Sequence, residues 1–84
     1  MSRCECCGAP IAEPVIETVA GEFRPGFGLC SGCWALVGYG RRRELAAARL
    51  AFRAAPGLES AVMFYWLWQL AVGEAVFRSG RVAA

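Results

Sequence analysis

The sequence predicts a small α+β domain in which a loop-rich N-terminal part with a short β-hairpin precedes two α-helices. Three observations support this class. The chain has only 84 residues, which is enough for one small core. All five cysteines fall among Gly and Pro residues in the first part of the chain, and two apolar stretches separated by Pro56-Gly57 follow. We expect two units, residues 1–40 and 41–84, that pack together as one compact domain.

The first regular structure that the pattern predicts is a β-hairpin. Residues 15–19, "VIETV", alternate well enough for a short strand, and Ala20-Gly21 is suited to the turn. The segment "EFR", residues 22–24, then returns as the second strand. "RPGFG" breaks this strand before Leu29 and Cys30.

Three helices are expected after the hairpin. Ser31 is a credible N-cap for a first helix that begins at residues 32–34 and continues through "ALV". The segment "GYG", residues 38–40, should end or kink this helix. Residues 41–55, "RRRELAAARLAFRAA", consist of strong helix formers that Pro56-Gly57 terminates. A last helix should run from residue 58 or 59 to about Arg78.

Composition limits the cellular compartment and the chemistry. Between Met1 and Cys4 there is no room for the basic and apolar regions of an export signal, so we expect a cytoplasmic protein in a reducing environment. Lys, Asp, Asn and His are absent, a bias typical of GC-rich bacterial or phage coding sequences. Without His and Asp there is neither a Ser-His-Asp nor a Cys-His pair. We therefore expect that the protein is not an enzyme.

Two CxxC pairs carry the main chemical signal: Cys4 with Cys7, and Cys30 with Cys33. Disulfides are disfavoured because the number of cysteines is odd and no export signal is present. A thiol redox protein would use one CxxC pair after a strand of a larger βαβ fold, for which this chain is too short. The second pair would also remain unexplained.

A metal site uses all four residues. Two thiolate pairs with this spacing can close a tetrahedron with bonds of about 2.3 Å. Gly8, directly after Cys7, tolerates the tight turn of a zinc knuckle, in which backbone amides point at the sulfur. Cys6 is then the spare thiol, although Cys6 in place of Cys7 stays open. We expect one structural zinc ion, with iron as the competing metal.

A catalytic zinc ion would need an open coordination position and a nearby acid or base. Four thiolates fill the coordination shell, and the sequence has no His to assist. Glu5 is close along the chain, but an isolated Glu in a knuckle is expected to be solvated. These features favour a structural ion.

One knuckle, a hairpin and two further cysteines at the start of a helix resemble the treble-clef zinc fingers. Cys33 is followed by Trp34 and not by Gly, so the second pair does not look like another knuckle. The resemblance covers about residues 3–37. It implies that Cys4 and Cys7 are knuckle ligands and that Cys30 and Cys33 are ligands at the helix start. The group includes nucleic-acid binders, protein-binding modules and enzyme parts, so the resemblance implies a fold more than a function.

Basic residues are concentrated in the second half of the chain. The first forty residues have a formal charge of −2 and the remainder +4, counted from Arg and Glu. In the helix of residues 41–55, a narrow sector of arginines lies beside an apolar stripe of Leu45, Ala48, Phe52 and Ala55 that should face the core. Such a row of cations can bind phosphates or an acidic protein surface, or it can be a solvated face. The candidate residues are Arg41, Arg42, Arg43, Arg49 and Arg53.

The last helix is apolar on nearly every side. One continuous stripe consists of Ala61, Phe64, Tyr65, Trp68, Val72, Ala75 and Val76. The other side carries Met63, Trp66, Leu67 and Leu70. The uninterrupted apolar run is too short for a membrane span, which needs about 20 residues. Because a chain of this size cannot easily cover both sides, we expect this second group to contact a partner protein or another copy. Full burial within a compact monomer is the alternative.

These observations predict a non-catalytic zinc-finger protein that acts as a protein-interaction adaptor or regulator. The treble-clef resemblance implies a place in transcription or other nucleic-acid machinery. Direct nucleic-acid binding through the arginine-rich helix is the second hypothesis, and a thiol redox protein is the third.

Overall fold

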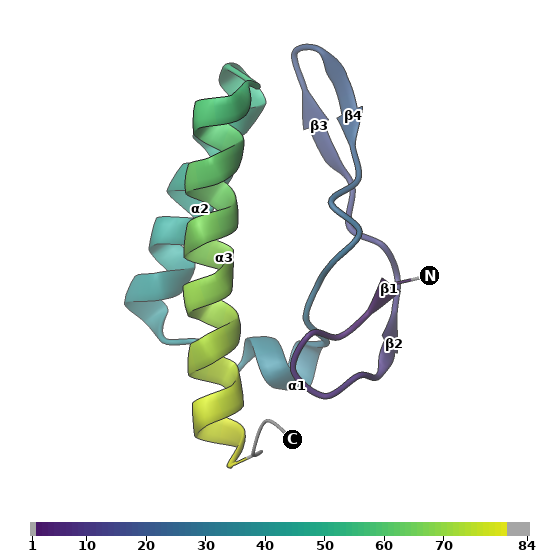
Figure 1. Ribbon diagram of the computed structural model, residues 1–84, viewed down its shortest axis with the longest axis vertical. Helices are drawn as coiled ribbons and strands as arrows, with labels where there is room; N and C mark the ends of the chain where they lie inside the picture. Colours follow the sequence, from purple (N-terminus) through teal and green to yellow (C-terminus); the bar gives the residue numbers. More distant parts are fainter. Residues whose placement is uncertain (1, 81–84) are drawn as a thin grey trace.

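The computed structural model of the chain describes residues 2–80 and shows two small antiparallel sheets beside a pair of long helices (Figure 1). Residue 1 and residues 81–84, the outer ends of the two expected units, lie outside this description. The elements are β1 (Ser2–Arg3), β2 (Pro10–Ile11), β3 (Ile16–Thr18), β4 (Gly21–Phe23), α1 (Ser31–Trp34), α2 (Tyr39–Ala54) and α3 (Leu58–Ser79). The prediction of a mixed fold with a hairpin followed by helices is confirmed at this level.

The two long helices form an antiparallel hairpin, as the sequence predicts. Pro56-Gly57 separates them, and the Ser60 hydroxyl donates to the Ala55 carbonyl at 2.9 Å, which closes the tight connection. Helix α3 ends where Gly80 adopts a left-handed conformation with φ of +71°. This end lies close to the expected one at Arg78.

The hydrophobic core lies between the helix hairpin and the N-terminal part. Its buried members are Val37, Leu45, Trp68, Ala71 and Ala75. Ala71 and Ala75 are fully buried, and their small side chains allow α2 to approach α3 closely. Several side chains from before residue 37 pack against the same cluster, so one core serves both parts of the chain.

The apolar stripe of α2 is nearly the predicted one. Leu45, Ala48 and Phe52 are buried, but Ala55 is exposed. Ala55 lies at the C-cap, where the backbone has left the helical conformation, so it no longer continues the stripe. That part of the prediction was wrong.

The β3–β4 hairpin forms within one residue of the expected bounds. Thr18 pairs with Gly21, so the turn is Val19-Ala20, one residue earlier than predicted. The Thr18 hydroxyl fixes this turn, since it donates to the Gly21 carbonyl at 2.7 Å and accepts from the Ala20 amide at 3.2 Å. Gly21 belongs to the second strand with φ of +125°, a conformation that favours glycine.

Helix α1 is shorter than the sequence predicts. Its N-cap is Cys30 and not Ser31, and no side chain provides a capping hydrogen bond. After Trp34 the amides of Leu36 and Val37 donate to carbonyls three residues back, so the chain tightens into a turn instead of continuing as a helix. Gly38 then serves as the N-cap of α2, which begins at Tyr39, two residues before the expected start.

The β3–β4 hairpin is attached to the C-terminal part of α2. The Phe23 and Phe52 rings meet edge to face with centroids 4.9 Å apart. The Val19 amide donates to the Arg53 carbonyl at 3.1 Å, and Arg53 Nε donates to the Glu17 carbonyl at 3.0 Å. Figure 1 shows the hairpin standing alongside this end of the helix pair.

A half-buried carboxylate joins the start of α2 to α3. Glu74 accepts hydrogen bonds from Arg41 Nε at 2.8 Å and from the Gly38 amide at 3.2 Å, and it forms an ion pair with Arg78 at 3.7 Å. The hydrogen bond from Arg41 is the main reason that the pKa of Glu74 is lowered, although burial acts in the opposite direction. The ionised carboxylate therefore holds the junction together.

Replacing Glu74 with Gln should lower the free energy of unfolding by about 1–2 kcal/mol at neutral pH, because charged hydrogen bonds become weaker neutral ones. The pKa of Glu74 is depressed in the folded state, so its contribution is present above the ordinary value of 4.5 and lost as the pH falls through the lowered value. The difference in the free energy of unfolding between wild type and variant, measured by urea denaturation, should therefore disappear in acid. A gap that stays constant with pH would contradict this role for the carboxylate.

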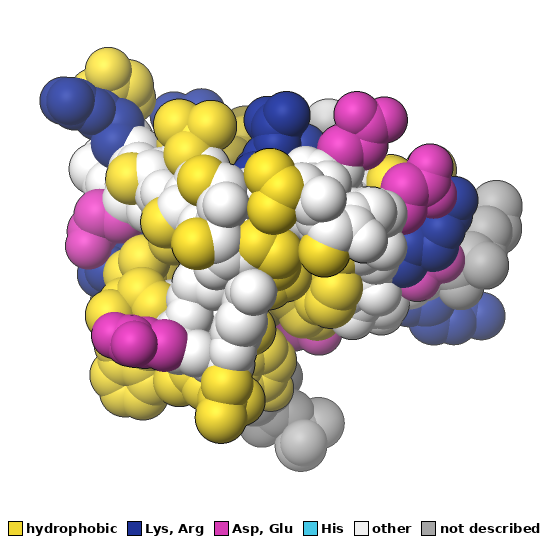
Figure 2. Space-filling model, turned by 90° about the horizontal axis from the view of Figure 1, so that it is seen from above, with side chains coloured by type: hydrophobic (Ala, Val, Ile, Leu, Met, Phe, Trp, Pro, Cys, Tyr) yellow, Lys and Arg dark blue, Asp and Glu magenta, His cyan; other side chains and the backbone are white. Residues whose placement is uncertain are grey.

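Helix α3 is buried on one side only. Trp68, Ala71 and Ala75 are buried, whereas Met63, Trp66 and Phe77 are 55%, 62% and 86% exposed. Full burial within the monomer, the alternative considered from the sequence, is therefore wrong. Apolar side chains also reach the surface at the end of the molecule where α2 meets α3 (Figure 2).

Candidate metal centre

The first cysteine pair lies in a tight loop between β1 and β2. The Cys4 amide donates to the Ala9 carbonyl at 2.7 Å, and the Gly8 amide donates to the Cys4 carbonyl at 2.8 Å. Gly8 has φ of +77°, as expected for the residue that completes the turn after Cys7. The Cys7 amide points at Cys4 Sγ from 3.5 Å, the knuckle-like arrangement that the Gly8 position predicts.

The second pair is placed by the start of α1. Cys30 has an extended backbone, while Cys33 lies within the helix and is buried. The Trp34 amide donates to the Cys30 carbonyl at 2.8 Å, which closes the first turn. One helical turn therefore brings the two thiols of this pair to the same side.

Backbone pairing brings the two loops together. Cys4 forms an isolated parallel bridge with Gly28, and the Glu5 amide donates to the Gly28 carbonyl at 3.0 Å. Neither this contact nor the β1–β2 pairing was predicted, because both join segments with no distinctive local pattern. Together they hold the first cysteine loop against the segment that leads into α1.

The four sulfur atoms of Cys4, Cys7, Cys30 and Cys33 all lie within 4.8 Å of one another. Cys7 Sγ and Cys30 Sγ are 3.7 Å apart. A tetrahedral ion with bonds of about 2.3 Å to sulfur requires sulfur–sulfur distances of about 3.8 Å. The group combines two cysteines from the first loop with two from the start of α1, and it could hold one metal ion. All five cysteines are free thiols.

The proton affinities of these thiols are unequal. Burial raises the pKa of Cys4, but backbone hydrogen bonds from Cys30, Cys7 and Cys6 outweigh it and lower the pKa to about 6. A backbone hydrogen bond from Cys33 lowers the pKa of Cys30. Cys4 and Cys30, one from each loop, therefore lose their protons more readily than an ordinary cysteine does.

The other two thiols retain their protons more strongly. Burial, followed by the neighbouring thiols, raises the pKa of Cys33. At Cys7 the backbone of Ala9 acts to lower the pKa, but the side chain of Cys4 and burial raise it overall. Four adjacent thiolates repel one another, so complete deprotonation requires a cation among them.

Cys6 lies outside the four-sulfur group. Its thiol donates to Ser79 Oγ at 3.9 Å, and its side chain packs against the core. The group that could bind a metal therefore contains Cys7 and not Cys6. In this arrangement Cys6 links the first cysteine loop to the C-terminal end of α3.

The arginines of α2 are distributed among several roles. Arg41 pairs with Glu44 and Glu74, and Arg43 lies over the Tyr39 ring at 5.8 Å. Arg53 binds the β3–β4 hairpin through the Glu17 carbonyl. Arg42 and Arg49 line a cleft between α2 and the N-terminal part. The five candidates thus do not form one continuous basic patch, and their binding to phosphate stays a prediction.

The candidate interface residues of α3 differ in exposure. Met63 and Trp66 are largely exposed, whereas Leu67 and Leu70 are partly buried and Leu67 packs against the core. Val62, which the sequence analysis did not include, is 58% exposed beside Met63. Its spacing of four residues from Trp66 could have identified it.

Glu5 corrects an expectation about the first cysteine loop. The residue is exposed, but it is not simply solvated, because Trp68 Nε1 donates to Glu5 Oε2 at 3.3 Å. This hydrogen bond connects the cysteine loop to the middle of α3. No local sequence signal marks it, since the two residues are 63 positions apart.

Comparison with protein-family models, curated proteins and solved structures finds no match for this chain. What its own structure defines is a small mixed α/β protein with a four-cysteine group able to hold a metal ion. By length and composition alone, α3 could cross a membrane. A single such helix is weak evidence, because helices of soluble cores pass the same test.

Proposed function

We propose that this chain is a non-catalytic zinc-binding protein in which one structural zinc ion is held by Cys4, Cys7, Cys30 and Cys33. The observation that carries the proposal is the convergence of these four sulfur atoms within 4.8 Å. Four thiolates saturate a tetrahedral ion and leave no position for substrate. The treble-clef arrangement is part of the same proposal. It is supported by the positions of the ligands, since one cysteine pair lies in the loop that Gly8 completes and the other lies at the start of α1.

The zinc ion would join two loops whose own secondary structure is too short to hold them together. The strands around the first loop are two residues long, and α1 has four residues. Elements this short are not stable alone, so the ion contributes folding free energy. Zinc suits four thiolates better than hard cations do, and iron is the competing ion.

We further propose that α3 presents an interaction surface to a partner protein or to a second copy of the chain. Met63, Trp66, Leu70 and Phe77 follow the alternating spacing of three and four residues that brings side chains to one face of a helix. Three of them are more than half exposed, and Gly73 in the same row leaves room for close approach. We call this row the outer seam of α3.

The other side of α3 supports docking in preference to membrane insertion. Trp68, Ala71 and Ala75 are buried in the protein core, and Glu74 is ion-paired with Arg41 and Arg78. A spanning helix would have to place this charged group in hydrocarbon. The outer seam therefore fits the role of an adaptor or regulator, and a place in transcription or other nucleic-acid machinery is the extension that the zinc-finger resemblance suggests.

The Met63→Glu/Trp66→Glu double variant should lose complex formation while keeping its metal and its melting temperature, because both side chains point away from the core. Analytical sedimentation of the purified chain measures self-association. Affinity capture, with isotope labelling to compare the proteins bound by wild type and by the variant, identifies other partner proteins. Val19→Glu is the matched control, since Val19 is 78% exposed on the β3–β4 turn, away from the seam. A monomeric wild type whose captured proteins are unchanged in the double variant would contradict the proposal.

Direct nucleic-acid binding is less well supported. Arg41 and Arg53 already bind other parts of the chain. The formal charge of +2 falls to zero if four thiolates and one Zn²⁺ add −2. Phosphate contacts require affinity to fall steeply with salt, so the absence of binding to random DNA and RNA at low salt would remove this alternative.

A further inference from the structure

A cleft of about 890 Å³ opens between α2, the first half of α3 and the loops of the N-terminal part. Its apolar walls include Phe27, Trp34, Leu45, Leu50, Phe64 and Trp68. This volume lies in the range typical of small-molecule sites. The interaction surface proposed above is the outer seam of α3, so the cleft is a separate feature.

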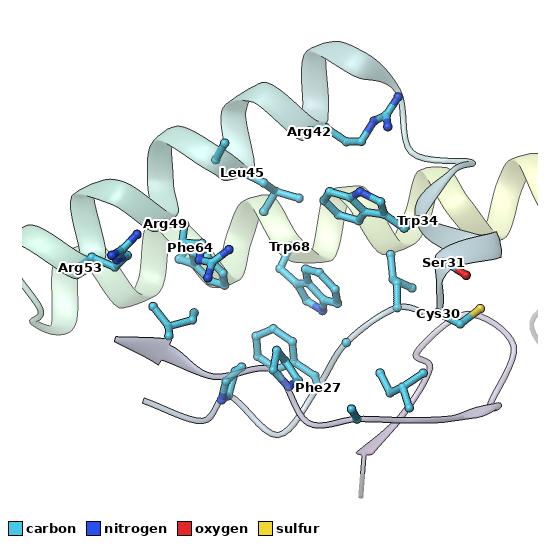
Figure 3. A pocket seen from close by; sticks show the side chains of 18 of the residues that line it. Phe27, Cys30, Ser31, Trp34, Arg42, Leu45, Arg49, Arg53, Phe64 and Trp68 are labelled. Carbon is cyan, nitrogen blue, oxygen red and sulfur yellow. The ribbon is translucent and has the colours of Figure 1, made fainter. Parts of the chain in front are cut away.

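The aromatic part of the cleft is held in place by the fold. The Phe27 and Trp68 rings lie 4.9 Å apart at an interplanar angle of 30° (Figure 3). Trp68 is only 7% exposed, and its indole nitrogen is bound to Glu5. Because both rings are restrained, an apolar ligand would meet a preformed surface and would pay little ordering entropy.

The α2 side of the cleft is cationic. Arg42, Arg49 and Arg53 are spaced seven and four residues apart and follow one face of α2, with Arg42 beside Trp34 and the other two near Phe64 (Figure 3). Among the described residues that line the cleft there is no Asp or Glu. The α2 border of the apolar surface is therefore positively charged, and no carboxylate among the lining residues balances it.

Two of these arginines lack partners for their side chains within residues 2–80. Arg42 Nε is buried and has no hydrogen-bond acceptor there. Arg49 makes no side-chain hydrogen bond or ion pair with the described part of the chain. A buried donor without an acceptor is unfavourable, so the site is suited to a ligand that brings an anion.

We propose that this cleft binds a free fatty acid, with the carboxylate bound by the unpaired Arg49 guanidinium and the hydrocarbon chain along Phe27, Phe64 and Trp68. A carboxylate supplies the acceptor that the guanidinium groups lack, and the chain covers the apolar walls. A peptide fits less well. Its backbone amides would need acceptors, and Ser31 provides the only hydroxyl among the lining side chains described.

The test uses the zinc-loaded 84-residue chain carrying Trp66→Phe, so that tryptophan emission comes from Trp34 and Trp68, which both line the cleft. A brominated fatty acid should quench this emission saturably, and calorimetry should show one laurate bound per chain below micelle-forming concentrations. Dodecanol and dodecyltrimethylammonium should bind at least roughly tenfold more weakly, because they lack the charge-assisted hydrogen bonds.

Arg49→Gln should weaken laurate binding by roughly tenfold, as expected for loss of one charged hydrogen bond, without changing metal content or melting temperature. Arg49 is exposed, so this variant is not expected to disturb folding. Arg43→Gln is the matched control, since Arg43 belongs to the same helix but lies outside the cleft. Equal affinity for the alcohol, no effect of Arg49→Gln, or binding only of acidic peptides or RNA would overturn the proposal. Each of these readouts is independent of the outer seam of α3.

Discussion

The Cys33→Ser variant is expected to lose stoichiometric metal and to be largely unfolded. Cys33 is 6% exposed and supplies one of the four sulfur atoms, so a serine hydroxyl in its place would leave the ion with only three thiolate ligands. Structural zinc contributes about 10 kcal/mol or more to the folding of small metal-dependent domains. Total stabilities are of the same order, about 5–15 kcal/mol, so little folded protein would remain. Elemental analysis and circular dichroism of the purified variant measure both effects.

Two further cysteine variants provide the controls. Cys6→Ser should keep both metal and fold, because Cys6 lies outside the four-sulfur group and its hydrogen bond to Ser79 is long, at 3.9 Å. Cys7→Ser should lose the metal. The opposite outcome for these two neighbours would show that the ligand assignment is displaced by one residue. A chelated wild-type protein that keeps its native spectrum would contradict the structural role of the ion.

The Trp68→Ala variant should lose about 3–5 kcal/mol of unfolding free energy in the metal-loaded protein. Trp68 fills the centre of the shared core, contacts the Phe27 ring and donates to Glu5. Its removal leaves a cavity and also breaks the hydrogen bond from the middle of α3 to Glu5 in the first cysteine loop. Chemical denaturation at a fixed excess of zinc gives the difference.

Trp66→Ala is the matched comparison, because the same side chain two residues earlier is 62% exposed. A surface truncation of this kind should change stability by no more than about 0.5 kcal/mol. If the two variants lost equal stability, the orientation of α3 described here would be wrong.

The parts of the fold with strong local signals could be predicted from the sequence. Ala, Leu and Arg define α2, Pro56-Gly57 separates the helices, and the alternation before Ala20 marks the hairpin. The four-cysteine group was also predictable, since the CxxC spacing and Gly8 determine its local geometry. In each case nearby residues decide the local conformation, whereas the meeting of the two cysteine pairs depends on the contact between Cys4 and Gly28.

Features that depend on distant residues could not be predicted in this way. The Cys4–Gly28 bridge and the Glu5–Trp68 hydrogen bond join segments that only the folded core brings together. Ser31 was expected to cap α1, but Cys30 takes this position. The arginine sector of α2 was visible in the sequence, whereas the cleft beside it depends on where Phe27 and Trp68 meet.

The shared core also limits how this protein can be divided. Cys6, Phe27, Leu29 and Trp34 pack on a cluster of five buried residues, four of which, Leu45, Trp68, Ala71 and Ala75, belong to the helix hairpin. If the chain were cut near residue 40, the core side chains of each fragment would be exposed to water, because the surface that buries them belongs to the other fragment. Recombination during evolution, or fusion in the laboratory, must therefore transfer the N-terminal part and the helix hairpin together if either is to stay folded.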